Sequence, residues 1–108
     1  KNDNQSFLEM KESLNKLSEY SKRTNSKVLL TVIPDIHFLE DYPFQTIHEK
    51  MKTLSTELGF EYHDLLPSLK NIPFEELQII QGDSHPNELG HYKISQSLYP
   101  KIKEIIIN

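Results

Sequence analysis

An aspartate and a histidine two residues apart offer the most direct chemistry in this sequence. Asp83 and His85 lie in residues 81–91, QGDSHPNELGH. A carboxylate at this spacing can hold one ring nitrogen of the imidazole, so that the other accepts a proton from a nucleophile. Pro86 limits the backbone freedom of His85, and Asn87 is a good cap for a following helix. The pattern predicts an acid–base pair on a firmly held loop.

The same stretch contains Gly-Asp-Ser, the letters of a serine nucleophile motif. Ser84 lies between Asp83 and His85, where the neighbouring imidazole is badly placed to take its proton. A motif of this kind counts only in its structural context, and here it follows the last expected strand. We therefore interpret Ser84 as a loop residue. No other serine follows a strand in a Gly-x-Ser setting, so we expect the nucleophile to lie outside this chain.

The other histidines have simpler interpretations. We expect His91, in the first turn of a helix, to pack against or hydrogen-bond to the preceding loop, and His48 to lie on the exposed face of a helix. Asp83, His85 and His91 also form a possible zinc-binding set. This alternative is the weaker one, because no His-x-x-x-His pair on one helix supports it. No metal ion or organic cofactor is implied.

Two further groups of polar residues resemble functional sites. His63 and Asp64 are adjacent in an expected strand, where neighbours point to opposite faces, so we interpret their pairing as coincidental. The loop after residue 34 contains three more titratable residues, His37, Glu40 and Asp41. They could line a substrate cleft, but we interpret this segment as a solvated acidic loop.

Composition sets the broad class of the protein. At 36% hydrophobic and 26% charged residues, the 108 residues are typical of one ordinary globular domain. A net charge of -4 without a basic cluster argues against a nucleic-acid partner. No apolar run approaches the roughly 20 residues that cross a bilayer, and none near the start resembles a signal peptide. The absence of cysteine excludes disulfides and fixes no compartment.

Hydrophobic spacing predicts alternating helices and strands. We expect helices over residues 7–20, from Pro43 to Gly59, and from residue 86 or 87 to 105 with a bend at Pro100, together with a short helical turn over 74–77. The run 28–33 is almost continuously apolar and predicts a strand buried on both faces, and residues 60–66 predict a second. The helix between them predicts a right-handed βαβ unit in a parallel sheet.

Two strands are few for a sheet that helices cover on both faces. The chain also begins at Lys1 and not at methionine. We therefore expect it to be part of a larger α/β domain. If it exists alone, the uncovered flank of residues 28–33 would be open to pairing, and we expect self-association through this sheet edge.

Residues 83–91, followed by an amphipathic terminal helix, closely resemble the last conserved block of the SGNH (GDSL-type) esterases and acylhydrolases. The order of elements from Val28 onward is similar to the second half of that family. The resemblance implies a flavodoxin-like three-layer α/β/α sandwich with a parallel sheet. This chain would be its C-terminal part, residues 1–108, with two strands and three main helices. It also implies that His85 is the general base, Asp83 its orienting acid and a serine the nucleophile.

The chain departs from the family pattern in two ways. Many members separate the aspartate and histidine by two residues, whereas here only Ser84 intervenes. The family's nucleophile motif lies near the amino terminus after the first strand, with oxyanion-hole glycine and asparagine beyond it, and this chain lacks that arrangement. The resemblance thus implies two members of a triad without the third, and we expect no hydrolysis by these residues alone.

The function expected of the parent protein is that of a serine esterase or acylhydrolase that cleaves or transfers an acyl group through an acyl-serine intermediate. Its substrate would be a small-molecule, carbohydrate or lipid ester, selected by variable loops. The alternative, from a different class, is a noncatalytic α/β module that keeps the scaffold for binding or assembly.

Overall fold

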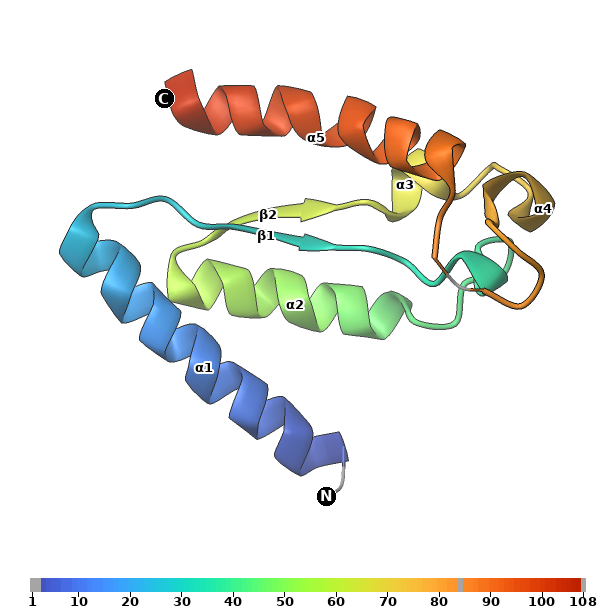
Figure 1. Ribbon diagram of the computed structural model, residues 1–108. Helices are drawn as coiled ribbons and strands as arrows, with labels where there is room; N and C mark the ends of the chain where they lie inside the picture. Colours follow the sequence, from blue (N-terminus) through green and yellow to red (C-terminus); the bar gives the residue numbers. More distant parts are fainter. Residues whose placement is uncertain (1–2, 84, 108) are drawn as a thin grey trace.

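The structure is a computed structural model that describes residues 3–83 and 85–107. Figure 1 shows its elements along the chain. In sequence order they are α1 (Asp3–Thr24), β1 (Leu29–Val32), the 3-10 helix η1 (Ile36–Phe38), α2 (Gln45–Leu58), β2 (Glu61–Asp64), α3 (Leu66–Leu69), α4 (Phe74–Leu77) and α5 (Glu88–Ile107).

The two strands form a parallel sheet, with α2 as the connection between them. Leu29 lies opposite Glu61, and Val32 lies opposite Asp64. Helix α2 lies on one side of the strands and α5 on the other (Figure 1). The expected strand–helix–strand unit and its parallel pairing are therefore confirmed, and the described residues form a small α/β fold. No helix in the described ranges is long and apolar enough to cross a membrane.

The first strand is less buried than its sequence predicted. Each residue of β1 is only partly buried, and Ile33, just beyond it, is 58% exposed. The prediction of burial on both faces was wrong for this chain because, within the described residues, β1 has a strand neighbour on one edge only. The expected self-association through the other edge stays a prediction.

The ends of the helices and strands can be compared with those predicted from the sequence. Gly59 ends α2 in the left-handed conformation, at φ 75°, as its sequence position predicted. Helix α2 begins at Gln45, two residues later than expected, because Pro43 and Phe44 form a turn. The second strand ends at Asp64, and the next residues turn into α3. Helix α5 continues through Pro100.

Among the described residues, buried apolar side chains gather in two clusters, one at each end of the sheet. The cluster at the amino ends packs α1 and α2 against the strands and includes Met10, Leu14, Leu54, Leu58 and Phe60. The cluster at the carboxyl ends joins η1, α3, α4 and α5 through Ile36, Leu39, Leu65, Leu66, Leu69, Leu77 and Ile94. This second cluster fixes the loops that follow the strands, where a functional site is expected.

A buried polar network links α2 to the end of β2. His48, predicted to be exposed, is only 2% exposed. Its Nδ1 lies 2.9 Å from Asp64 Oδ1, and its Nε2 lies 2.7 Å from the Tyr42 hydroxyl. Because an ionised carboxylate only accepts hydrogen bonds, Nδ1 donates to Asp64 and Nε2 accepts from Tyr42. The ring is buried because both of its nitrogens have partners.

Two tyrosines, Tyr42 within this network and Tyr62 beside it, have raised pKa values. Burial, helped by the negative charge of Asp64 and by Tyr42, raises the pKa of Tyr62 to about 12. Burial also raises the pKa of Tyr42, although a backbone hydrogen bond with Asp35 opposes the shift. Both hydroxyls therefore stay protonated at neutral pH, and Tyr62 donates to the backbone carbonyl of His48 at 2.9 Å.

Replacement of His48 by alanine should destabilise the fold by about 2–4 kcal/mol, since it leaves a cavity and removes a partner from both Asp64 and Tyr42. The free energy of unfolding is measured by urea denaturation. The matched control is His91→Ala on the exposed surface of α5, which should stay within about 0.5 kcal/mol of the wild type. Equal stabilities for the two variants would contradict the network.

Candidate active site

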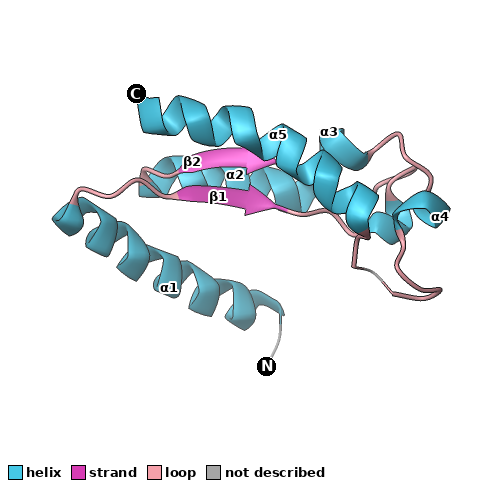
Figure 2. Ribbon diagram, turned by 45° about the horizontal axis from the view of Figure 1, so that its top comes forward, coloured by secondary structure: helices cyan, strands magenta, loops and turns pink. Residues whose placement is uncertain are grey.

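The loops at the carboxyl ends of the two strands converge on one region of the molecule. Figures 1 and 2 show η1, α4 and the loop before α5 together beyond the tips of the strand arrows. In parallel α/β sheets, ligands bind beyond the carboxyl ends of the strands. Asp83 and His85 belong to the loop before α5 and therefore to this region.

Asp83 holds His85 through a single carboxylate oxygen. Asp83 Oδ1 accepts a hydrogen bond from the backbone N–H of His85 at 2.9 Å and lies 2.6 Å from its Nδ1. The expected contact between the two side chains is therefore present. Since the carboxylate can only accept, Nδ1 carries the proton and Nε2 keeps a free lone pair. The imidazole is 81% exposed, whereas the carboxylate is 27% exposed, so Nε2 is accessible to a reacting group.

The carboxyl group of Asp83 is favoured in its charged form. Its pKa lies below the ordinary value of 3.8, chiefly because the His85 backbone N–H and then the His85 side chain hydrogen-bond to it. The charge that the His85 and His37 rings carry when they are protonated acts in the same direction. Asp83 is therefore ionised at neutral pH, which is the state that orients an imidazole and stabilises an imidazolium.

Asn87 ties the start of α5 to α4. Its side-chain oxygen accepts from the backbone N–H of Gly90 at 3.1 Å, so it caps the helix as predicted. Its side-chain amide donates to the carbonyl oxygens of Glu76 and Gln78 at 2.8 and 3.2 Å. Its backbone N–H donates to Leu77 O at 2.7 Å. The side-chain oxygen, side-chain amide and backbone N–H of Asn87 are thus all hydrogen-bonded, only two positions after His85.

Gly90 allows α5 to lie directly against the loop that it follows. A Cβ atom at this position would lie 2.6 Å from Pro86 Cβ and 3.5 Å from Leu77 Cδ2. The first distance is too short for two carbon atoms, so any other residue would displace Pro86 and with it His85.

A second aspartate–histidine pair, which sequence reasoning missed, lies on η1. Asp35 Oδ1 accepts from the His37 backbone N–H at 3.0 Å and lies 3.0 Å from its Nδ1. The His37 ring stacks on Phe74, with centroids 4.6 Å apart and planes inclined by 34°. The signal was present, because Asp35-Ile36-His37 repeats the spacing of Asp83 and His85.

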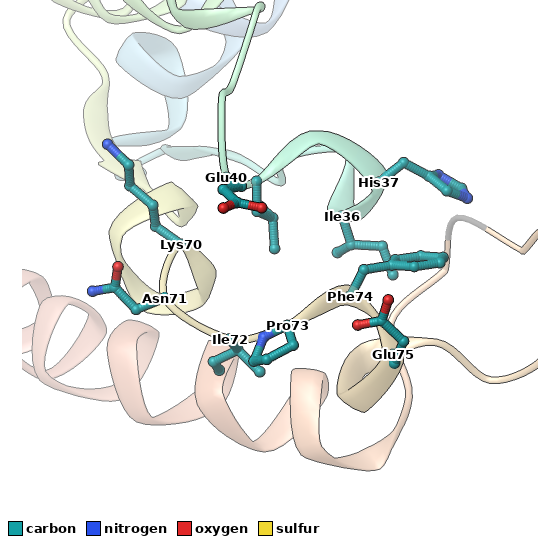
Figure 3. Close-up of a pocket in the computed structure, with 10 residues that line it drawn as sticks. Ile36, His37, Glu40, Lys70, Asn71, Ile72, Pro73, Phe74 and Glu75 are labelled. Atoms are coloured by element: carbon teal, nitrogen blue, oxygen red, sulfur yellow. The ribbon is translucent and has the colours of Figure 1, made fainter.

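A cavity of about 550 Å³ lies beside His37. Its walls come from η1, the loop after it, and the segment around α4 (Figure 3). Its lining residues are Ile36, His37, Leu39, Glu40 and the run from Lys70 to Glu75. His37 and Glu40, interpreted from the sequence as part of a solvated loop, are exposed, and they line this cavity because the buried residues Ile36 and Leu39 fold the loop back onto α4. Asp41 is exposed, as expected.

The remaining predicted residues lie apart from this pair. His63 Nε2 lies 2.7 Å from Ser97 Oγ on α5, while Asp64 faces His48 on α2, so the prediction that these neighbours point to opposite faces is confirmed. His91 is exposed, and its ring forms no hydrogen bond with the described residues. Within those residues, no three histidine, aspartate or glutamate side chains are grouped to hold a metal ion. Ser84 lies outside the described residues.

The depressed pKa of Asp83 can be measured by carbon-detected NMR titration of its carboxyl group. We expect a value below 3.8 in the wild type and an intermediate one in His85→Ala, which loses the ring contact but keeps the larger backbone contribution. A group with a lowered pKa stabilises the fold above its unfolded value and loses this contribution as the pH falls through the folded value. The loop should thus stay ordered at pH 3.8 and lose this contribution only as the pH falls through the lower pKa of the folded state. An unshifted pKa in the wild type would contradict the geometry.

No family model, curated protein or solved structure matches this chain. The conclusions about function therefore rest on the geometry of the site and on the sequence of residues 83–91.

Proposed function

We propose that this chain supplies the general base and the orienting acid of an SGNH-type serine esterase or acylhydrolase. One observation carries the proposal: His85 Nδ1 is held 2.6 Å from the Asp83 carboxylate, while the rest of the imidazole is exposed at the carboxyl ends of parallel strands. An imidazole in this state has one nitrogen fixed and the other ready to accept a proton.

In the proposed reaction, His85 Nε2 takes the proton of a serine hydroxyl as the serine oxygen bonds to the ester carbonyl carbon. The imidazolium then returns this proton to the alcohol oxygen as the bond between that oxygen and the carbonyl carbon breaks, leaving an acyl-serine. Water or a second alcohol, deprotonated by the same nitrogen, attacks the acyl-serine and restores the hydroxyl. Asp83 keeps Nδ1 protonated throughout and stabilises the positive charge on the ring.

The proposed nucleophile lies outside the described residues. Two described serines beside the sheet have other partners: the Ser68 hydroxyl donates to Leu65 O at 2.6 Å, and Ser97 lies against His63. The Ser55 hydroxyl on α2 is fully buried, so no ester can reach it. We propose that the serine and its oxyanion hole reach the site from a segment that adds strands to the free edge of β1. The sheet would then be part of a flavodoxin-like three-layer sandwich. Helices on both sides of a parallel sheet support this arrangement.

The test compares the 108-residue chain with the longer protein that the proposal requires. Hydrolysis of p-nitrophenyl acetate and labelling by a fluorophosphonate serine probe should occur in the longer protein only. There, His85→Ala and Asp83→Asn should each lower kcat by about 10³- to 10⁴-fold, because the base or its tautomer is lost. The exposed control His91→Ala should keep full activity.

Two results would overturn the proposal. Hydrolysis by the 108 residues alone would place the nucleophile within them. Absence of hydrolysis and labelling in both proteins would favour a noncatalytic binding or assembly module that keeps the same scaffold.

A further inference from the structure

One side of helix α5 packs against the rest of the molecule, and the other side is exposed. Ile94 belongs to the buried cluster at the carboxyl ends of the strands. Figure 1 shows α5 as the outermost element on its side of the sheet. Four large apolar or aromatic residues of its exposed side form a row that we call the outer stripe: Tyr92 (57% exposed), Tyr99 (66%), Ile102 (42%) and Ile106 (75%).

The outer stripe has the spacing of a seam between paired helices. Its residues follow one another at intervals of seven, three and four, which are the intervals between a and d positions of a heptad repeat. Ser95 occupies the remaining d position. The row extends about 21 Å along the helix, at about 1.5 Å for each residue. Single exposed apolar residues are common on protein surfaces, whereas a continuous row of them marks an interaction surface.

Charged side chains do not interrupt the outer stripe, although 26% of the chain is charged. Between residues 88 and 103, the lysines and acidic residues of α5 are only Lys93 and Lys101, and both are partly buried. Lys101 follows Ile94 by seven residues and therefore shares its packed side of the helix. Charged residues are depleted at the centre of protein interfaces, so their absence from the outer stripe favours contact with a protein partner.

Two charges of opposite sign lie at the ends of this uncharged stretch. Glu88 is exposed in the first turn of α5, and Lys103 is exposed near its last turn. Neither forms an ion pair with another described residue. If a second copy of α5 runs antiparallel, with a two-fold axis between residues 95 and 96, Glu88 of each copy lies beside Lys103 of the other. A parallel pair in register would instead bring like charges together.

Completion of the sheet would leave the outer stripe uncovered. Strands added at the free edge of β1 extend the sheet sideways, in its own plane. The outer stripe points away from that plane, because α5 lies along one face of the strands (Figure 1). The segment that supplies the nucleophile in the proposed function therefore does not compete for this surface.

We propose that two copies of this chain associate through the outer stripe, as an antiparallel pair of α5 helices related by a two-fold axis. The row of apolar residues is complementary to itself under this symmetry, with Tyr92 of each copy packed against Tyr99 of the other. The opposite charges at its ends fix the direction of the pair. This inference concerns assembly and is independent of the proposed esterase activity.

The test measures association of the 108-residue chain by sedimentation velocity, from about 5 μM to about 500 μM. We expect a monomer that converts to a dimer within this range. Tyr99→Lys should raise the dissociation constant at least about tenfold, because each copy would bury an unpaired ammonium group. Since Tyr99 is exposed, the fold should stay intact, which urea denaturation checks. The control Thr53→Lys adds the same charge to the exposed surface of α2 and should leave the dissociation constant unchanged.

Charge reversal tests the direction of the pair. Glu88→Lys should weaken association by about three- to tenfold, since two attractive contacts become two repulsive ones. Combination with Lys103→Glu should restore the wild-type dissociation constant, because the opposite charges face each other again. A parallel pair would show no such restoration.

Disulfide cross-linking tests the position of the two-fold axis. The chain contains no cysteine, so a single substitution reports on a single position. Ser95→Cys lies beside the axis and should cross-link to its copy on oxidation. Ile106→Cys should not, because the two copies of this position would lie about 30 Å apart along the helices.

Three results on the 108-residue chain would overturn the inference: a monomer at every concentration, a dimer that Tyr99→Lys leaves unchanged, or equal cross-linking at positions 95 and 106. The second is the result expected if the copies pair through the edge of β1. A longer protein that stays monomeric while the 108 residues dimerise would also overturn it, because another segment would then cover the outer stripe.

Discussion

One carboxylate oxygen, Asp83 Oδ1, holds both the backbone and the ring of His85, and the chemistry of the site depends on this double contact. The carboxylate stays charged because the hydrogen bonds that it accepts lower its pKa. The contact orients the ring only if the loop itself is held in place, and residues at the start of α5 hold it. The Asn87 side-chain amide donates to the carbonyl oxygens of Glu76 in α4 and of Gln78 just after it. Gly90 has no side chain, so Pro86 can lie directly against α5. Packing of α5 thus determines the direction of an exposed ring.

The described residues contain three contacts between a histidine Nδ1 and an aspartate, and burial distinguishes their roles. His48 is 2% exposed, and its Nε2 is already occupied by Tyr42, so this ring holds α2 to β2. The His37 side chain is 29% exposed and stacked on Phe74, which suits the wall of a binding cavity. His85 is 81% exposed and suits proton transfer. The same pairing can therefore hold two elements together or leave a ring nitrogen open to solvent, according to what the second nitrogen can reach.

Features set by neighbouring residues could be predicted from the sequence. Gly59 and Asn87 mark helix ends through backbone conformation and capping, and Asp83 contacts His85 within one local loop. Contacts between distant residues were harder to predict. His48 was predicted to be exposed, but the buried positions of α2 are 48, 54, 55 and 58, with 51 partly buried between them. Its partners, Tyr42 and Asp64, come from a preceding loop and a different strand, so helical spacing alone did not identify them.

The central claim is that Asp83 fixes the tautomer of His85, and nitrogen-detected NMR of the histidine rings at neutral pH tests it most directly. The account predicts a protonated Nδ1 and an unprotonated Nε2 for His85 in the neutral ring. It also predicts a shift towards the mixture of tautomers found in free histidine when Asp83 is replaced by asparagine. A wild-type ring protonated at Nε2, or one that Asp83→Asn leaves unchanged, would contradict the account.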